Sequence, residues 1–118
     1  MSISYIYHKG KKIMLCDYSQ CKTKEETIRV LDLARNEYLK SDEKFLVLND
    51  FTGGVVSNEF MDRAKEYGKE LFDARTPKTV SIGITGMKKV FISTYNLFVK
   101  NKLQFFDTKT EALEYLVK

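Results

Sequence analysis

The sequence predicts a single α/β domain, built on one mixed sheet of about five strands and four helices. Two observations lead to this prediction. The chain has 118 residues with 43% hydrophobic content and a single proline, which suits one packed core and leaves no room for a second. Strand-like and helix-like segments follow one another in the order β-β-α-β-α-β-α-β-α, and crossover helices between strands imply mostly parallel neighbours. We therefore expect residues 1–118 to form one domain.

The first element is predicted to be an N-terminal β-hairpin. Apolar and more polar side chains alternate over residues 3–7, and Ile13 and Leu15 continue the same period of two. Between these runs, residues 8–12 contain one glycine and three lysines, a composition typical of a turn. The two strands are then expected to pair antiparallel.

A helix and a buried strand are predicted next. Thr23 and Glu26 have the spacing of a capping box, in which each side chain bonds the other residue's backbone N–H. The helix that follows is expected to bury a stripe of apolar residues: Ile28, Leu31, Ala34, Tyr38 and Leu39. The short apolar run Phe45–Leu48 is bounded by polar turns, as expected of a strand that is covered on both faces.

The second half repeats this alternation. Ser57 is expected to cap a helix whose inward stripe is Phe60, Ala64, Tyr67 and Leu71. Val80, Ile82 and Ile84 indicate a strand, and the turn after it leads into a helix with an expected buried side of Val90, Phe91, Thr94, Tyr95 and Phe98. The last strand is predicted at Leu103–Phe106. A second capping box, Thr108 with Glu111, opens the last helix.

Composition argues against several classes of function. Twenty basic and sixteen acidic residues give a net charge of +4, but the lysines are spread along the chain and only four arginines occur, so nucleic-acid binding is not expected. Cys16 and Cys21 lie too close together for a structural zinc site, and no second Cys/His pair accompanies them. His8 is the single histidine and follows a strand beside the lysine-rich turn, a usual place for a surface residue. We expect no cofactor, no metal and no enzyme activity.

The N-terminus lacks a signal-peptide pattern, and no apolar stretch is long enough to cross a bilayer. A cytoplasmic protein without a transmembrane segment is the resulting expectation.

Acidic residues at the expected carboxyl ends of strands leave one catalytic alternative open. Ligands of open parallel sheets gather at this edge. Asp17, Asp50, Thr85 and Asp107 fall there, with Lys109 close behind, which suggests a receiver-like or metal-dependent site. A receiver domain needs five consecutive β-α units, however, and acidic residues at strand ends are also common turn formers.

Two further hypotheses concern small ligands. The predicted turn into the third helix holds Thr85, Gly86 and Lys88, where free backbone donors would suit an anion and Lys88 and Lys89 would add positive charge. Seven tyrosines and eight phenylalanines in so short a chain also leave open an apolar ligand or lipid, held in a pocket between a helix and the sheet.

Several segments together resemble the STAS family (sulphate transporter and anti-sigma factor antagonist), in particular its SpoIIAA-like members. The likeness lies in the opening hairpin, the strand of residues 45–50, the segment 78–84, and the final pair of 103–107 and 110–116. The resemblance implies a non-catalytic regulatory or scaffold domain that binds a protein partner, and it leaves a homodimer open.

In STAS antagonists a serine at the start of the second helix is phosphorylated and controls docking to the partner. Ser57 stands at the matching place, but Val56 precedes it and Asn58 follows it, where the family pattern has aspartate before and serine or threonine, then glycine, after. The resemblance implies a partner-binding surface around this helix start, made of Asp50, Gly53, Gly54, Ser57, Asn58 and Glu59.

Overall fold

The computed structural model describes residues 2–118, apart from the side chain of Met87, and contains a five-stranded sheet in the order β1-β2-β3-β4-β5. The elements along the chain are β1 (Ile3–His8), β2 (Lys11–Asp17), α1 (Lys24–Leu39), β3 (Leu46–Asp50), α2 (Asn58–Tyr67), η1 (Gly68–Phe72), α3 (Asp73–Arg75), β4 (Lys78–Ile82), α4 (Met87–Asn96), β5 (Gln104–Phe106) and α5 (Lys109–Val117).

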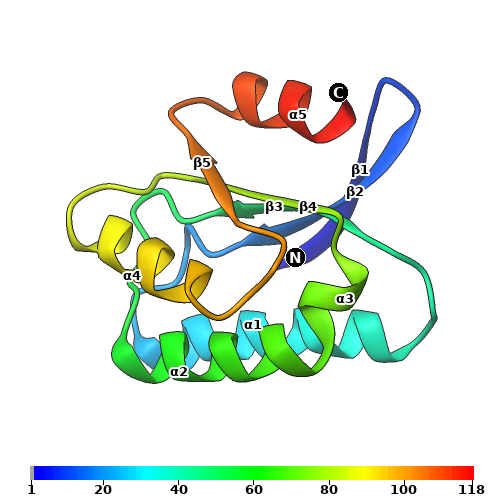
Figure 1. The fold of residues 1–118 in the computed structure, drawn as a ribbon. Helices are drawn as coiled ribbons and strands as arrows, with labels where there is room; N and C mark the ends of the chain where they lie inside the picture. The colour runs from blue at the N-terminus through cyan, green and yellow to red at the C-terminus, as the bar shows by residue number, and fades with distance from the viewer. Residues whose placement is uncertain (1) are drawn as a thin grey trace.

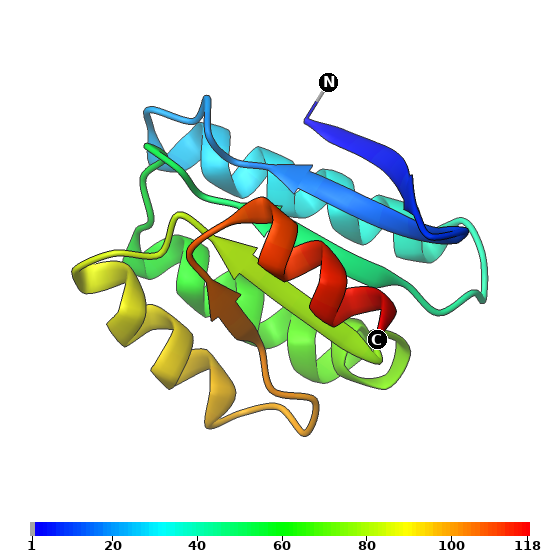
Figure 2. The same ribbon diagram turned by 90° about the horizontal axis from the view of Figure 1, so that it is seen from above.

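The molecule has three layers, with the sheet in the middle. Helices α1, α2 and α4 lie on one face of the sheet and α5 lies on the other (Figures 1 and 2). The π-helical turn η1 and the short α3 continue α2 without leaving helical backbone angles, so α2, η1 and α3 form one helical rod. The predicted mixed sheet of about five strands and four helices is therefore confirmed.

The hairpin is also confirmed. β1 pairs antiparallel with β2, and β2, β3, β4 and β5 pair parallel in sequence. A two-residue turn joins β1 to β2, with φ of 50° at Lys9 and 80° at Gly10. Positive φ at both positions is the geometry of a type I′ turn, whose twist matches that of the two strands.

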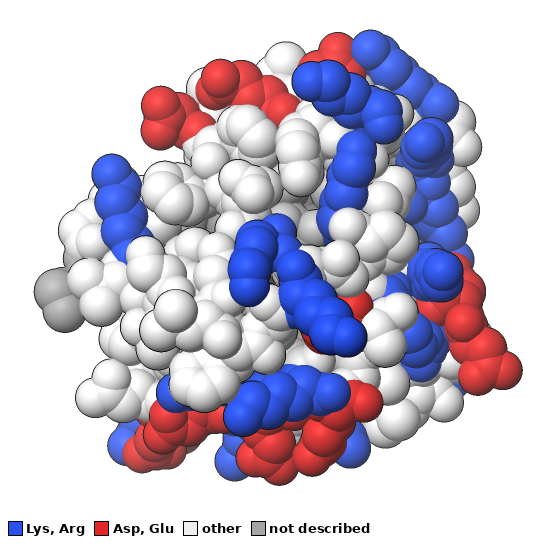
Figure 3. Space-filling view, in the orientation of Figure 1, with Lys and Arg blue, Asp and Glu red and all other residues white. Residues whose placement is uncertain are grey.

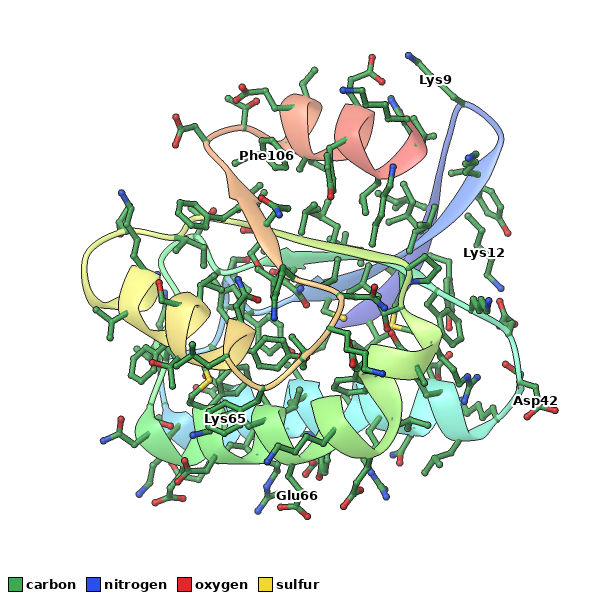
Figure 4. The ribbon with its side chains drawn as sticks, in the orientation of Figure 1. Lys9, Lys12, Asp42, Lys65, Glu66 and Phe106 are labelled. Carbon is green, nitrogen blue, oxygen red and sulfur yellow. The ribbon has the colours of Figure 1, made fainter. Side chains whose placement is uncertain are left out.

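Alternation along the strands builds two cores. Side chains on one face of the sheet, such as Met14, Cys16 and Val47, pack under α1, α2 and α4. Side chains on the opposite face pack under α5, where Ala112 and Leu116 form one cluster with residues of three strands: Ile13, Leu48, Val80 and Ile82. Phe106 of β5 also points toward α5 (Figure 4), where its ring lies 5.4 Å from that of Tyr115.

Three details of the predicted faces are wrong. Val90 of α4 is 52% exposed and Phe98, which follows the end of α4, is 42% exposed, whereas Ile92 of α4 is buried. Leu39 is likewise exposed at the end of α1. The helix α4 packs against the molecule through the side that holds Phe91, Ile92 and Tyr95, and the surface on its outer side is largely uncharged (Figure 3). Val90, which lies off that side, therefore faces solvent.

Basic side chains from elsewhere in the chain cap the ends of three helices. The last turns of α1, α4 and α5 contain no basic residue, although their free carbonyls favour positive charge. Arg75 donates to carbonyls at the end of α1, Lys102 to carbonyls at the end of α4, and Lys78 to carbonyls at the end of α5. These three basic residues thus serve the fold.

Candidate functional site

Two loops meet at the carboxyl ends of β2 and β3. The backbone N–H of Tyr18 donates to the carbonyl of Asp50 (2.8 Å), and that of Val55 donates to the carbonyl of Cys21 (3.3 Å). The hydroxyl of Thr27, which is buried in the first turn of α1, donates to the carbonyl of Val55 (3.0 Å). These bonds join residues 18–22 to residues 50–56, so the two loops form one unit.

Gly54 lets the two loops come this close. It is buried, and a Cβ at this position would lie 2.3 Å from the carbonyl oxygen of Tyr18. Neighbouring Gly53 is exposed, has φ of 73°, and accepts a hydrogen bond from Lys22 Nζ at its carbonyl (3.3 Å). The position of the loop therefore depends on residue 54, while residue 53 faces outward.

Ser57 caps α2. Its hydroxyl oxygen accepts a hydrogen bond from the N–H of Phe60 (3.1 Å), and its side chain is half-buried. Two residues further, Glu59 forms an ion pair with Lys24 of α1 (2.7 Å), which holds the pKa of the Glu59 carboxyl below its usual value. The starts of α1 and α2 are thereby linked at the surface.

The six residues expected to bind a partner divide into two groups. Gly53, Asn58 and Glu59 are exposed, whereas the other three serve the fold: Gly54 is buried, Ser57 is a cap, and the carboxylate of Asp50 accepts the N–H of Thr52 (3.0 Å). We call the exposed set the 52–59 surface; its members are Thr52, Gly53, Val55, Asn58 and Glu59.

Lys22 and Lys24 flank the 52–59 surface, and the sequence reasoning missed them. The capping box at Thr23 could have pointed to them, because it starts α1 directly after the β2 strand and so at the same edge of the sheet.

The strand-end carboxylates Asp17 and Asp50 are hydrogen-bonded within their own turns. Asp17 and Asp50 are neighbours in the register of β2 and β3, but each accepts hydrogen bonds from its own turn, Asp17 from Ser19 and Asp50 from Thr52. Among residues 2–118, no three His, Cys, Asp or Glu side chains come together as metal ligands. The parallel strands also follow one another in a single direction, so the sheet lacks the reversal of strand order where such folds usually bind ligands.

Lys88, which was expected to bind an anion at the start of α4, donates to backbone carbonyls instead. Lys88 Nζ donates to the carbonyls of Phe51 (2.9 Å) and Gly83 (3.3 Å), which fastens the start of α4 to the ends of β3 and β4. Thr85 and Gly86 are exposed, and Gly86 has φ of 55° at the N-cap position. The ammonium group of Lys88 is therefore occupied by backbone oxygens and does not extend over the helix start.

A small cavity lies between the sheet and the helices α1, α2 and α4. Its volume is about 90 Å³, and its lining is mainly apolar, with Phe91 and Tyr95 on the α4 side. Asn49 and Thr79 line it from the sheet, where the amide of Asn49 donates to the hydroxyl of Thr79 (3.2 Å). Pockets for drug-sized ligands measure roughly 300–1,000 Å³, so this cavity holds a much smaller group.

Both cysteine thiols are buried in this fold. Burial raises the pKa of the Cys16 thiol to about 12, so it carries its proton at neutral pH. Cys21 is also buried, and its pKa is raised for the same reason. His8 lies on the surface with Nε2 3.1 Å from a carboxylate oxygen of Glu114.

Comparisons with known proteins bear on the fold. No protein-family model matches the chain, and no curated protein matches it. Among solved structures, the chain is similar to an uncharacterized protein from the DUF3478 family with a SpoIIAA-like fold, from Shewanella loihica PV-4. The TM-score is 0.65 at 19% identity, over 97% of this chain and 91% of that one. This likeness confirms the expected STAS-like architecture. Within the described part of the chain, no helix is long and apolar enough to cross a membrane.

Proposed function

We propose that this SpoIIAA-like fold serves as a non-catalytic regulatory domain that binds a protein partner through the 52–59 surface. The observation that carries the proposal is the bonding between the two loops. Val55 is held at its N–H by Cys21 and at its carbonyl by Thr27, while its side chain stays 37% exposed. A surface whose backbone is already fixed loses little conformational entropy when a partner binds.

The chemistry of the 52–59 surface suits a protein partner. Val55 offers apolar area and Asn58 an exposed amide, and both stand beside the ion pair of Lys24 and Glu59. Apolar contact surrounded by polar and charged groups is the common composition of non-obligate protein interfaces.

Regulation by phosphorylation of Ser57 is not part of the proposal. The hydroxyl oxygen already accepts the N–H of Phe60, and the ion pair of Glu59 already occupies the helix start. The partner would instead recognise the exposed side chains that follow the cap, Asn58 and Glu59.

The test is a comparison of co-purifying proteins in source cells. The double variant Asn58→Ala/Glu59→Ala removes two exposed side chains and keeps the Ser57 cap, so it is expected to fold normally. At least one protein that co-purifies with the tagged wild-type chain should fall by about tenfold or more, a loss in the range of a few interface contacts. Quantitative mass spectrometry of the captured proteins measures this.

The matched control is Asp62→Ala/Glu66→Ala on the same helix. Both side chains are exposed, and Glu66 points away from the sheet (Figure 4). This variant should retain every partner. If all proteins captured by the wild type also remained on the Asn58→Ala/Glu59→Ala variant, the 52–59 surface would not be the binding site.

A second candidate function, the carriage of a small apolar ligand, is supported by the cavity beneath α4. Ala34 and Ala64 line the cavity from α1 and α2, and both are buried. A ligand inside would contact mainly apolar side chains, with Asn49 available for one polar group.

Native mass spectrometry tests this candidate. A carrier purified without detergent should show an added mass in about stoichiometric amount, and Ala64→Leu should remove it by filling the cavity. If the wild type instead shows only the mass of the bare chain, and Ala64→Leu raises the melting temperature, the cavity is a packing defect without a ligand. Filling an empty apolar cavity can recover part of the free energy of unfolding that the cavity costs.

A further inference from the structure

β1 is an open edge of the sheet. It is the first strand in the order, and none of its six side chains is fully buried. Its backbone groups point alternately toward β2 and away from it. The N–H of Asp17 donates to the carbonyl of Ser2 (2.8 Å), and residues 8 and 11 flank the two-residue turn, so the even-numbered residues bond β2. The N–H and C=O groups of Ile3, Tyr5 and Tyr7 therefore face outward.

We propose that this edge binds the β1 strand of a second copy of the chain, antiparallel, with the two-fold axis at Tyr5. In this register Tyr5 lies opposite Tyr5 of the second copy, and Ile3 lies opposite Tyr7 on both sides of the axis. All outward-facing backbone groups of the strand then find partners, and the two five-stranded sheets become one sheet of ten strands. This surface contains no residue of the 52–59 surface.

The exposed side chains fit this pairing. Tyr7 is 69% exposed, an unusual state for a large aromatic side chain in a strand, and it would lie against Ile3 of the second copy. Ile3 and Tyr5 lie on the same side of the strand as Tyr7, where they are only partly buried in the core under α1. An aromatic residue opposite a β-branched one is a favourable cross-strand pair.

The same register brings no like charges together across the contact. The first five residues of β1 carry no charged side chain, so the edge lacks the charges that commonly prevent edge pairing. Residues that lie side by side on neighbouring strands form a row across the sheet. The row of Lys11 and His8 continues, across the new contact, through Ser2 to Asp17 of the second copy. Each row therefore has a basic end and an acidic end.

The charges at the hairpin tip do not oppose the contact. Glu114 pairs with both His8 and Lys9, at 3.1 and 2.9 Å, and Glu43 pairs with Lys12 at 3.3 Å. Both lysines belong to the hairpin in Figure 4. Antiparallel pairing also puts the two tips at opposite ends of the ribbon, so the lysines of one copy stay away from those of the other.

The experiment measures the mass of the untagged chain in solution by light scattering at micromolar to near-millimolar concentration. We expect a concentration-dependent dimer. Tyr7→Pro should make it a monomer, because proline removes an outward N–H while the bonds between β1 and β2 remain. Tyr7→Thr, which keeps the N–H, is the matched control and should still dimerise. Circular dichroism checks that both variants retain the fold.

A crosslink tests the register independently. With Cys16 and Cys21 buried, Tyr5→Cys provides the single accessible thiol and should form a disulfide-linked dimer under mild oxidation. Ile3→Cys and Tyr7→Cys, taken singly, should not, because each would lie about 13 Å from its own copy at the rise of a strand. The double variant Ile3→Cys/Tyr7→Cys should crosslink.

Two results would overturn the proposal. One is a wild type that stays monomeric over the whole concentration range, because the β1 edge would then not bind a second copy of the chain. The other is a dimer that persists in Tyr7→Pro, or one that crosslinks through Ile3→Cys or Tyr7→Cys alone, because its interface would not be the β1 edge in this register.

Discussion

Gly83→Ala is expected to destabilise the domain by about 3–5 kcal/mol. Gly83 directly follows β4 and has φ of 75°, a conformation in which a residue with a side chain is strained. A Cβ there would also lie 2.3 Å from the backbone nitrogen of Thr52 and 2.6 Å from its Cα. The backbone of the 50–56 loop would have to move, and chemical denaturation followed by circular dichroism measures the loss.

Gly53→Ala separates the two causes. Gly53 has φ of 73°, almost the same as Gly83, but nothing lies within 4 Å of its added Cβ. The strain alone should cost about 1–2 kcal/mol. The difference between the two variants therefore measures the clash with Thr52. Equal losses in free energy of unfolding would show that the contact between β4 and the loop can relax, and that strain accounts for both.

Features that depend on local sequence could be predicted. The type I′ hairpin needs only a short turn with glycine between alternating strands, and the cap of α1 needs only Thr23 and Glu26, whose reciprocal bonds are both present. Thr108 likewise accepts the N–H of Glu111 at the start of α5. In each of these cases the interacting groups are within a few residues of each other, so spacing alone identifies them.

The buried side of α4 could be predicted only in part, because apolar residues occur on several sides of this helix: Phe91, Thr94 and Tyr95 are partly buried as expected, but Val90 is exposed. Phe91, Tyr95 and Phe98 have helical spacing. The rest of the molecule buries Ile92 instead, covers Phe91 and Tyr95 only in part and leaves Phe98 exposed. Phe98 is instead covered in part by two lysines of the helical rod, with Lys65 Nζ 4.8 Å and Lys69 Nζ 4.7 Å from its ring centre. Periodicity orients a helix only when polar residues mark its solvent side.

The candidate site was predicted as a region but not in its details. Strand alternation identified the carboxyl ends of β2 and β3, and the family resemblance indicated the start of α2. Neither could show that Gly54 is buried against Tyr18 while Gly53 is exposed, because both are glycines in the same loop. Which glycine turns inward depends on contacts between segments about 35 positions apart in the sequence.

For the same reason, the sequence alone could not predict that distant basic residues cap helix ends. Arg75 makes the most hydrogen bonds to backbone carbonyls among these residues. Its guanidinium donates to the carbonyl of Tyr38 (2.8 Å) at the end of α1. It also donates to those of Ser41 (2.6 Å) and Glu43 (2.9 and 3.2 Å) in the loop that follows. It also lies 5.4 Å from the ring centre of Tyr38. One side chain thus joins the end of the helical rod to the loop that enters β3.

Arg75→Met should therefore lower the free energy of unfolding by about 2–4 kcal/mol, because methionine keeps the apolar stem but leaves several carbonyls without a charged donor. Arg75→Lys should recover only part of the loss, since an ammonium group cannot reach the three carbonyls with the planar geometry of a guanidinium. Denaturant titration of both variants measures the two values.

Arg63→Met is the matched control for this loss. Arg63 forms one exposed ion pair with Asp32 (3.1 Å) on the outer side of α1 and α2, and pairs of this kind contribute at most about 1 kcal/mol. A loss at Arg75 no larger than that at Arg63 would mean that water replaces the guanidinium at the three carbonyls. A clearly larger loss, with the lysine variant in between, would show that the entry of the chain into β3 depends on a residue more than thirty positions away.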